Sequence, residues 1–127
     1  LLDFGATLRG CWGAAWASSV DGKPLGTSGR ILVTHLTDVK NSGDRFRGRA
    51  CKVLEAWGRL PYLVQAGSAT IRLARADAAQ LRVWRLALSG RRVARVPAKV
   101  VNGALEFTAS TATAPDATFF YEVAARP

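Results

Sequence analysis

A run of apolar, β-forming residues passes into a polar turn over residues 29–43, and this feature constrains the fold more than any other. Its centre, Ile31-Leu32-Val33, consists of three consecutive branched or bulky side chains. A half-exposed strand alternates apolar and polar residues, whereas a strand covered on both faces is continuously apolar. We therefore expect a central strand here. An exposed loop should follow over residues 38–45, where Asn41 and Gly43 suit left-handed backbone angles.

Two dipeptides mark hairpins in the second half of the chain. Ser89-Gly90 and Asn102-Gly103 each lie between two apolar, β-forming segments. Asn-Gly is the strongest short hairpin signal, because both residues tolerate positive φ. We expect two hairpins in tandem, which would make a meander. Residues 68–74 and 118–124 alternate apolar and polar side chains, as half-buried strands do.

The first two tryptophans lie on a segment whose two faces differ in bulk. In an extended strand over residues 11–20, Trp12 and Trp16 fall on one face and small residues fall on the other. Either face could be the buried one, so core and surface positions both stay open for these two side chains. Trp57 and Trp84 are expected in the core, because tryptophan is highly buried on average.

These segments together predict an all-β fold with little or no helix. We expect seven to nine short strands in an antiparallel, two-sheet β-sandwich of the Greek-key or immunoglobulin-like kind. Residues 46–58 fit both a helical face and an edge strand, and we favour an irregular to extended segment. A length of 127 residues, 49% of them hydrophobic, suits one domain over residues 1–127. Because the chain has no methionine, even at position 1, we expect a piece of a longer polypeptide.

The net charge of +9 is unevenly distributed along the chain. Between Arg45 and Lys99 there are 13 basic residues and only two acidic ones, Glu55 and Asp77. Such a segment attracts polyanions, because arginine neutralises phosphate and carboxylate groups. No RNP-like, zinc-finger or helix-turn-helix signature accompanies it, so nucleic acid is a disfavoured partner. Acidic polysaccharide is an alternative polyanion that the arginines could bind by the same charge attraction.

The sequence offers little for catalysis or metal binding. Cys11 and Cys51 lack the paired spacing of a zinc site and His35 is the only histidine, so we expect no metal and no cofactor. Whether the two thiols form a disulfide stays open. We interpret His35 as a hydrogen-bonded structural residue. Glu106 and Glu122 alternate with core residues and should face solvent rather than form the carboxyl pair of a glycosidase. A Gly-x-Ser-x-Gly nucleophile motif is absent, so we do not expect this chain to be an enzyme.

Four short motifs, taken in order, carry a family resemblance. They are Val20-Asp21-Gly22-Lys23-Pro24-Leu25, Arg30-Ile31-Leu32-Val33-Thr34, Asn41-Ser42-Gly43, and Trp57-Gly58 followed by Pro61. Their order resembles the non-catalytic C-terminal β-sandwich domains of large bacterial glycoside hydrolases with a TIM-barrel catalytic domain. The resemblance covers residues 14–125. The basic stretch over residues 46–52 departs from it, which leaves a local role there open.

The resemblance implies a fragment from the C-terminal part of a secreted or periplasmic, polysaccharide-processing parent protein. The catalytic carboxylates of such a parent lie on its barrel, so no catalytic residue is carried over to this chain. The implied function is that of an accessory domain that packs on the catalytic domain of the same polypeptide and stabilises it.

The alternative function is a carbohydrate-binding module that uses exposed tryptophans and arginines. Its candidate ligand-binding residues are Trp12, Trp16, Arg45, Arg47 and Arg49. In an extended segment the three arginines share one strand face. No apolar run approaches the roughly 18 residues that a membrane span requires, so we expect a soluble module without a membrane partner.

Overall fold

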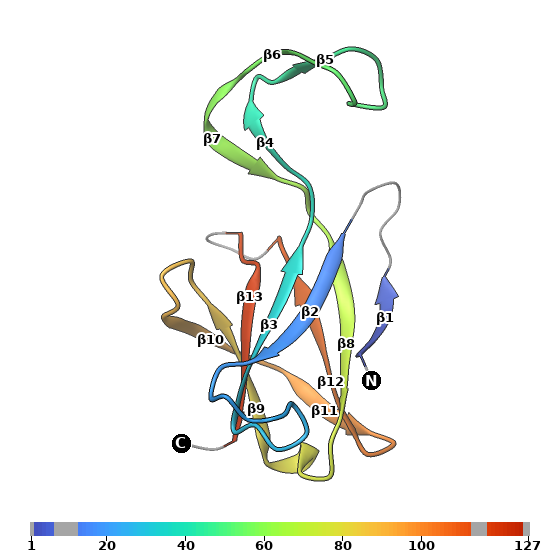
Figure 1. The fold of residues 1–127 in the computed structure, drawn as a ribbon, viewed down its shortest axis with the longest axis vertical. Helices are drawn as coiled ribbons and strands as arrows, with labels where there is room; N and C mark the ends of the chain where they lie inside the picture. The colour runs from blue at the N-terminus through green and yellow to red at the C-terminus, as the bar shows by residue number, and fades with distance from the viewer. Residues whose placement is uncertain (1, 7–12, 113–116, 126–127) are drawn as a thin grey trace.

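The computed structural model describes residues 2–6, 13–112 and 117–125 of the chain (Figure 1). Within these ranges, the chain consists of β-strands joined by turns and by one 3-10 turn, η1 (Ala78–Gln80). The strands are β1 (Leu2–Ala6), β2 (Ala14–Ser19), β3 (Arg30–Leu36), β4 (Val39–Ser42), β5 (Arg45–Phe46), β6 (Leu54–Ala56), β7 (Arg59–Val64), β8 (Ser68–Ala74), β9 (Leu81–Leu86), β10 (Arg92–Val96), β11 (Ala98–Val101), β12 (Ala104–Ser110) and β13 (Phe120–Ala125). Paired strands in the described ranges are antiparallel. The predicted all-β, antiparallel fold is therefore confirmed, whereas the predicted number of seven to nine strands is too low for the thirteen that the described residues form. The finer assignment as a two-sheet sandwich of the Greek-key or immunoglobulin-like kind stays a prediction.

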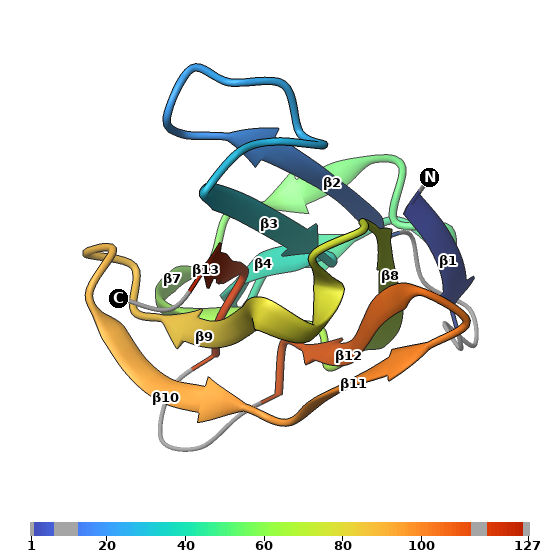
Figure 2. The same cartoon turned by 90° about the horizontal axis from the view of Figure 1, so that it is seen from below.

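Residues from the two larger sheets make up most of the hydrophobic core. Sheet A has the strand order β1-β8-β12-β11, and sheet B has the order β10-β9-β13-β3-β2 (Figures 1 and 2). Core side chains of sheet A include Ala69, Ile71, Leu73, Leu105, Phe107 and Ala109, and those of sheet B include Ile31, Val33, Leu81, Val83, Tyr121 and Val123. Because side chains alternate across a strand, the residues between these positions point away from the core. We call the two sheets the body and the side of each sheet away from the core its outer face.

The strand predicted to be central lies inside sheet B. It is hydrogen-bonded to β13 on one side and to β2 on the other. Ile31 and Val33 are fully buried in the core, whereas Leu32 is half-buried on the outer face. The central position is confirmed, and the outer face of this strand is only partly covered.

Both predicted hairpins form, but they belong to different sheets. β9 and β10 pair in sheet B around Ser89-Gly90, and β11 and β12 pair in sheet A around Asn102-Gly103. Asn102 (φ 49°) and Gly103 (φ 75°) both have the left-handed backbone that a two-residue hairpin turn needs. The predicted meander is wrong, because the chain passes from sheet B to sheet A at Pro97, which has no N–H to extend either ladder.

Between β3 and β8 the chain leaves the body as a projecting segment, which we call the arm (Figure 1). The arm comprises residues 39–64. Strands β4 and β7 pair near the body, and the short strands β5 and β6 pair farther out. The loop predicted for residues 38–45 is wrong over β4, which pairs through its backbone without an apolar period to reveal it. Gly43 has the predicted left-handed backbone, with φ of 83°. The irregular to extended conformation predicted for residues 46–58 is confirmed.

Candidate functional site

The arm concentrates exposed apolar side chains. Twelve large apolar side chains are exposed in the described part of the chain, and six of them lie on the arm. These six are Val39, Val53, Trp57, Leu60, Tyr62 and Leu63. A two-stranded ribbon has no second layer to cover its faces, so its apolar side chains stay in solvent. Exposed apolar side chains gathered in one place are typical of an interaction surface.

Trp57 is the most exposed of these side chains, at 79%, and the prediction that it lies in the core is wrong. The reason is its position. It precedes β7 on the arm, where the strands of the described residues pair only in twos. Leu60 (71% exposed) and Tyr62 (65% exposed) follow it on β7. An exposed indole and phenol together provide large contact area with one polar atom each, a combination enriched in protein interfaces.

A carboxylate fixes the backbone of the arm beside Trp57. The backbone N–H of Gly58 donates to Oδ1 of Asp44 (2.7 Å), and that of Asn41 donates to Oδ2 (2.8 Å). The Gly58 bond is the main reason that the pKa of Asp44 lies below its ordinary value. A Cβ atom at Gly58 would lie 2.2 Å from the carbonyl oxygen of Ser42, so only glycine permits this close approach. The arm therefore has a defined bend at this point.

The arm is also basic, because residues 39–64 contain six basic side chains and two acidic ones. Lys40 pairs with Asp38 (3.0 Å), and Arg47 pairs with Glu55 (2.8 Å). The other four basic side chains have no acidic partner among the described residues, and they are Arg45, Arg49, Lys52 and Arg59.

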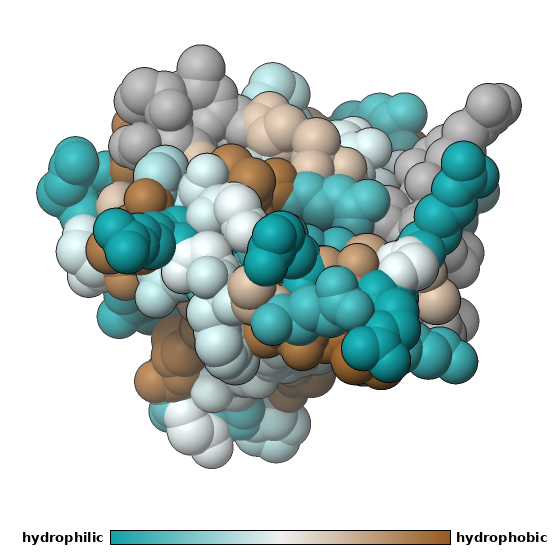
Figure 3. Space-filling model, turned by 90° about the horizontal axis from the view of Figure 1, so that it is seen from above, coloured by the Kyte–Doolittle hydropathy of each residue, from teal (hydrophilic) through white to brown (hydrophobic). Residues whose placement is uncertain are grey.

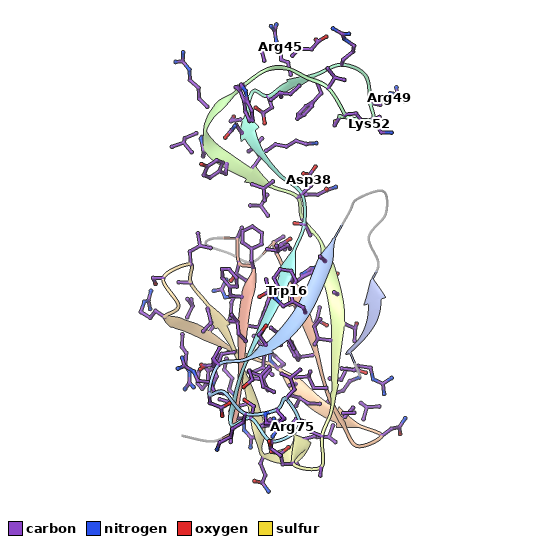
Figure 4. The ribbon with its side chains drawn as sticks, viewed as in Figure 1. Trp16, Asp38, Arg45, Arg49, Lys52 and Arg75 are labelled. Atoms are coloured by element: carbon purple, nitrogen blue, oxygen red, sulfur yellow. The ribbon has the colours of Figure 1, made fainter. Side chains whose placement is uncertain are left out.

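Three of these unpaired basic residues gather at the far end of the arm. Figure 4 shows Arg45, Arg49 and Lys52 there, away from the body. Figure 3 looks onto that end and shows hydrophilic side chains projecting around apolar ones. The arm therefore presents apolar and cationic groups side by side.

The three arginines predicted to share one strand face do not do so. β5 contains only two residues, and the chain bends at Arg47 and turns at Arg49. Gly48, with φ of 72°, lies between them and reverses the backbone. Arg45 and Arg49 are exposed on different segments of the arm tip. Alternation along the sequence could not reveal a turn that interrupts the strand after two residues.

A cleft of about 760 Å³ opens between the inner side of the arm and the adjoining end of the body. Leu36 belongs to the body side of its lining, and Phe46 and Leu54 belong to the arm. The ammonium of Lys40 lies 5.1 Å from the ring centroid of Phe46, and its pKa is raised mainly by its hydrogen bond to Asp38. The cleft is mostly apolar, with room for side chains of a molecule that contacts the arm.

The candidate tryptophans and arginines do not form one site. Trp12 lies outside the described residues. Trp16 is 43% exposed on the outer face of sheet B, and the alanines on either side of it pack against the core. Figure 4 shows Trp16 on the body, and Arg45 and Arg49 at the end of the arm. The described residues therefore do not combine Trp16 and these arginines in one carbohydrate site.

A second cluster, which the sequence analysis missed, lies on the outer face of sheet B. Glu122 on β13 accepts hydrogen bonds from Nε of Arg30 and from Nε of Arg92, the latter at 2.5 Å. The guanidinium of Arg92 lies 5.0 Å from the ring centroid of Trp84, which is cross-strand from Glu122. Burial raises the pKa of Glu122, but the two arginines outweigh burial and hold it below its ordinary value. No local pattern could have joined residues so far apart in sequence.

Two predictions for this face are wrong. Alternation correctly places Glu122 outside the core, but neighbouring side chains cover it and it is only 3% exposed. Trp84 is half-buried on the same outer face rather than in the core.

Glu106 is partly exposed on the outer face of sheet A, where it pairs with Arg72 (3.4 Å) and Lys99 (3.0 Å).

His35 is 1% exposed, and neither ring nitrogen has a hydrogen-bond partner. Its predicted hydrogen bond is thus absent from the described structure. Burial lowers the pKa of its imidazole. Cys51 is exposed with a free thiol in the described structure, and Cys11 lies outside the described residues.

The described residues contain no group of three or more His, Cys, Asp or Glu side chains that could hold a metal ion. They also contain no helix of the length and apolarity that a membrane crossing requires. Comparisons of the chain with protein-family models, with curated proteins and with solved structures gave no match. The resemblance to glycoside hydrolase domains therefore stays a prediction.

Proposed function

We propose that this chain is a non-catalytic accessory domain that docks through its arm onto the catalytic domain of the same polypeptide and stabilises it. The resemblance points to a glycoside hydrolase in a secreted or periplasmic setting. The observation that carries the proposal is the arm itself, with six exposed large apolar side chains and four unpaired basic ones.

The apolar side chains supply the reason for docking. A two-stranded ribbon in water is marginally stable, and covering its apolar side chains removes them from solvent. Trp57, Leu60 and Tyr62 are 79%, 71% and 65% exposed, so about two thirds or more of the surface of each residue is free to be buried by a partner. Tryptophan, tyrosine and arginine are the residue types that most often dominate binding energy at interfaces.

The basic side chains specify the chemistry of the partner. Arg45, Arg49 and Lys52 lie at the far end of the arm without acidic partners among the described residues. A complementary surface on the catalytic domain is apolar opposite β7 and carries carboxylates opposite the arm tip. Such exposed charge pairs steer association and are screened over about 8 Å at physiological ionic strength.

The test uses the full reading frame that encodes this chain. The catalytic part and this chain are purified separately, and their association is measured by titration calorimetry. The double variant Trp57→Ser, Leu60→Ser should weaken binding by about a hundredfold, since each buried aromatic or aliphatic anchor contributes on the order of 1 to 3 kcal/mol. Leu88→Ser is the matched control, because Leu88 is 73% exposed on the body, and it should bind like the wild type.

Three outcomes contradict the proposal. They are a reading frame that encodes no second domain, equal binding by the double variant and the wild type, and an equal melting temperature of the catalytic part with and without this chain. Wild-type binding should also weaken as salt rises, and the variant Arg45→Gln, Arg49→Gln, Lys52→Gln should lose most of that salt dependence.

A further inference from the structure

The ion cluster on the outer face of sheet B holds two guanidinium groups in fixed positions, as a binding site for an anion does. Arg30, Arg92 and Glu122 come from β3, β10 and β13, and both guanidinium groups bond the same carboxylate. We propose that this face binds a polysaccharide that carries carboxylate groups. Arg30 and Arg92 bind the carboxylates, and Trp16 packs against a sugar ring. The proposal concerns a surface separate from the arm and does not rest on arm docking.

The two guanidinium groups are held in place by Glu122, but each keeps N–H groups that Glu122 does not bond. Each donates its Nε hydrogen to Glu122, and the terminal amino groups have no partner among the described residues. The side chains of Arg30 and Arg92 are 62% and 38% exposed, whereas that of Glu122 is 4% exposed. A buried carboxylate thus holds two donor groups whose remaining N–H bonds are available to a ligand. Two positive charges and one negative charge leave a net charge that favours an anion.

Stability alone does not explain this cluster. Taking a carboxylate out of water is costly, and replacing a buried ion cluster with apolar side chains is often neutral or stabilising. The same position on a sheet could hold an apolar residue, as Leu32 does directly across from Glu122. A pre-oriented pair of guanidinium groups beside aromatic side chains is more readily understood as a recognition device.

The aromatic part of the site lies across the sheet. Trp16 on β2 is cross-strand from Thr34 on β3, which is cross-strand from Phe120 on β13. Since neighbouring strands are about 4.8 Å apart, Trp16 lies about 10 Å from the β13 strand that holds Glu122. A ligand that contacts both Trp16 and the arginines must therefore be extended, as a polymer is and a single small anion is not.

The chemistry favours an acidic polysaccharide over a nucleic acid. A carboxylate is planar and matches the fork of a guanidinium group, and the apolar face of a sugar ring can pack on an indole. Single-stranded nucleic acid requires a continuous basic groove with freely exposed stacking rings. Here Glu122 neutralises one of the two arginines, and the guanidinium of Arg92 covers one face of Trp84.

The experiment measures binding of the whole chain to three uronic-acid polymers, polygalacturonate, alginate and hyaluronate, by calorimetry at low salt. At least one should bind. When polygalacturonate is the ligand, its fully methyl-esterified form should bind about tenfold or more weakly, because esterification removes the charge and keeps the backbone. A single-stranded oligonucleotide is the competing polyanion.

Three variants locate the site. Arg92→Lys keeps the positive charge but loses the planar guanidinium group that can bond both oxygens of a carboxylate. It should weaken binding about tenfold. The triple variant Arg30→Gln, Glu122→Gln, Arg92→Gln removes all charge without leaving a lone buried carboxylate, and it should abolish binding. Trp16→Ala changes an exposed side chain outside the ion cluster and should also weaken binding about tenfold. The double variant Arg45→Gln, Arg49→Gln makes a charge change on the arm and should bind like the wild type.

The proposal is overturned if none of the three polymers binds, or if the arm variant loses as much affinity as Arg92→Lys. It is also overturned if Trp16→Ala, with an unchanged melting temperature, binds normally. Tighter binding of the oligonucleotide than of every uronic-acid polymer, lost in the same variants, would assign this face to nucleic acid instead.

Discussion

Replacing Gly58 with alanine should loosen the arm and leave the body intact. The added Cβ atom would lie 2.2 Å from the carbonyl oxygen of Ser42 and 2.6 Å from the backbone nitrogen of Asp44. Both contacts are with backbone atoms, so no side chain can rotate away. The two sides of the arm must separate by about 1 Å or more to restore ordinary contact distances. The hydrogen bond between Gly58 and Asp44, at 2.7 Å, is then lost.

The expected cost follows from the clash. Overpacking of this kind costs about 1 to 3 kcal/mol, and it applies to opening of the arm rather than to global unfolding. Opening therefore becomes roughly 5- to 150-fold more frequent, and amide exchange in the arm accelerates by the same factor. The amide of Arg47, which donates to the carbonyl of Val53 at 2.9 Å, reports this opening.

Hydrogen exchange followed by mass spectrometry is the assay, with thermal unfolding of the body as a second readout. The melting temperature should change by less than about 3 °C, because residues of sheets A and B make up most of the hydrophobic core. Gly26→Ala is the matched control, since a Cβ atom there meets nothing within 4 Å. Unchanged exchange at Arg47 in the Gly58 variant, or the same acceleration in the control, would refute the reasoning.

Other positions yield further predictions. The pKa of His35 is lowered by burial, so the unfolded chain takes up a proton before the folded one does; the free energy of unfolding should fall as pH drops below about 6.5, by up to about 1.4 kcal/mol per pH unit, and a His35→Leu variant should lose this slope in denaturant titrations. The hydroxyl of Tyr121 donates to the carbonyl of Ser110 (2.7 Å) and accepts from its N–H (2.8 Å), so Tyr121→Phe should cost about 1 to 3 kcal/mol by urea unfolding. Ile71→Ala in the core should cost about 2 to 5 kcal/mol, and a similar loss on truncating exposed Leu88 would contradict the assignment of the core.

Sequence patterns predicted the body of this protein well. Alternation over residues 68–74 corresponds to β8, whose Ala69, Ile71 and Leu73 enter the core, and the glycine-containing turns locate both hairpins. These features are local, because a strand period and a turn residue act within a few positions of the chain. The same local signals could not say which sheet each hairpin joins.

The arm and the ion cluster were beyond such patterns for two physical reasons. Trp57 is 79% exposed on an arm whose described strands pair only in twos, and the sequence alone gives no sign that this segment lacks a covering layer. Glu122 is buried by Arg30 and Arg92, which precede it by 92 and 30 positions, respectively. Its environment therefore depends on which strands are neighbours in the sheet. Of the candidate ligand residues, Trp16 is on an exposed face, and the arginines lie on the arm.

Docking through the arm is tested most directly by comparing hydrogen exchange of this chain alone with exchange of the same residues within the full-length polypeptide. Residues 39–64 should become markedly protected in the full-length protein, with the strongest effect over β7, while the amides of sheet A keep their rates. Equal exchange of the arm in the two states, or protection confined to the body, would contradict the account.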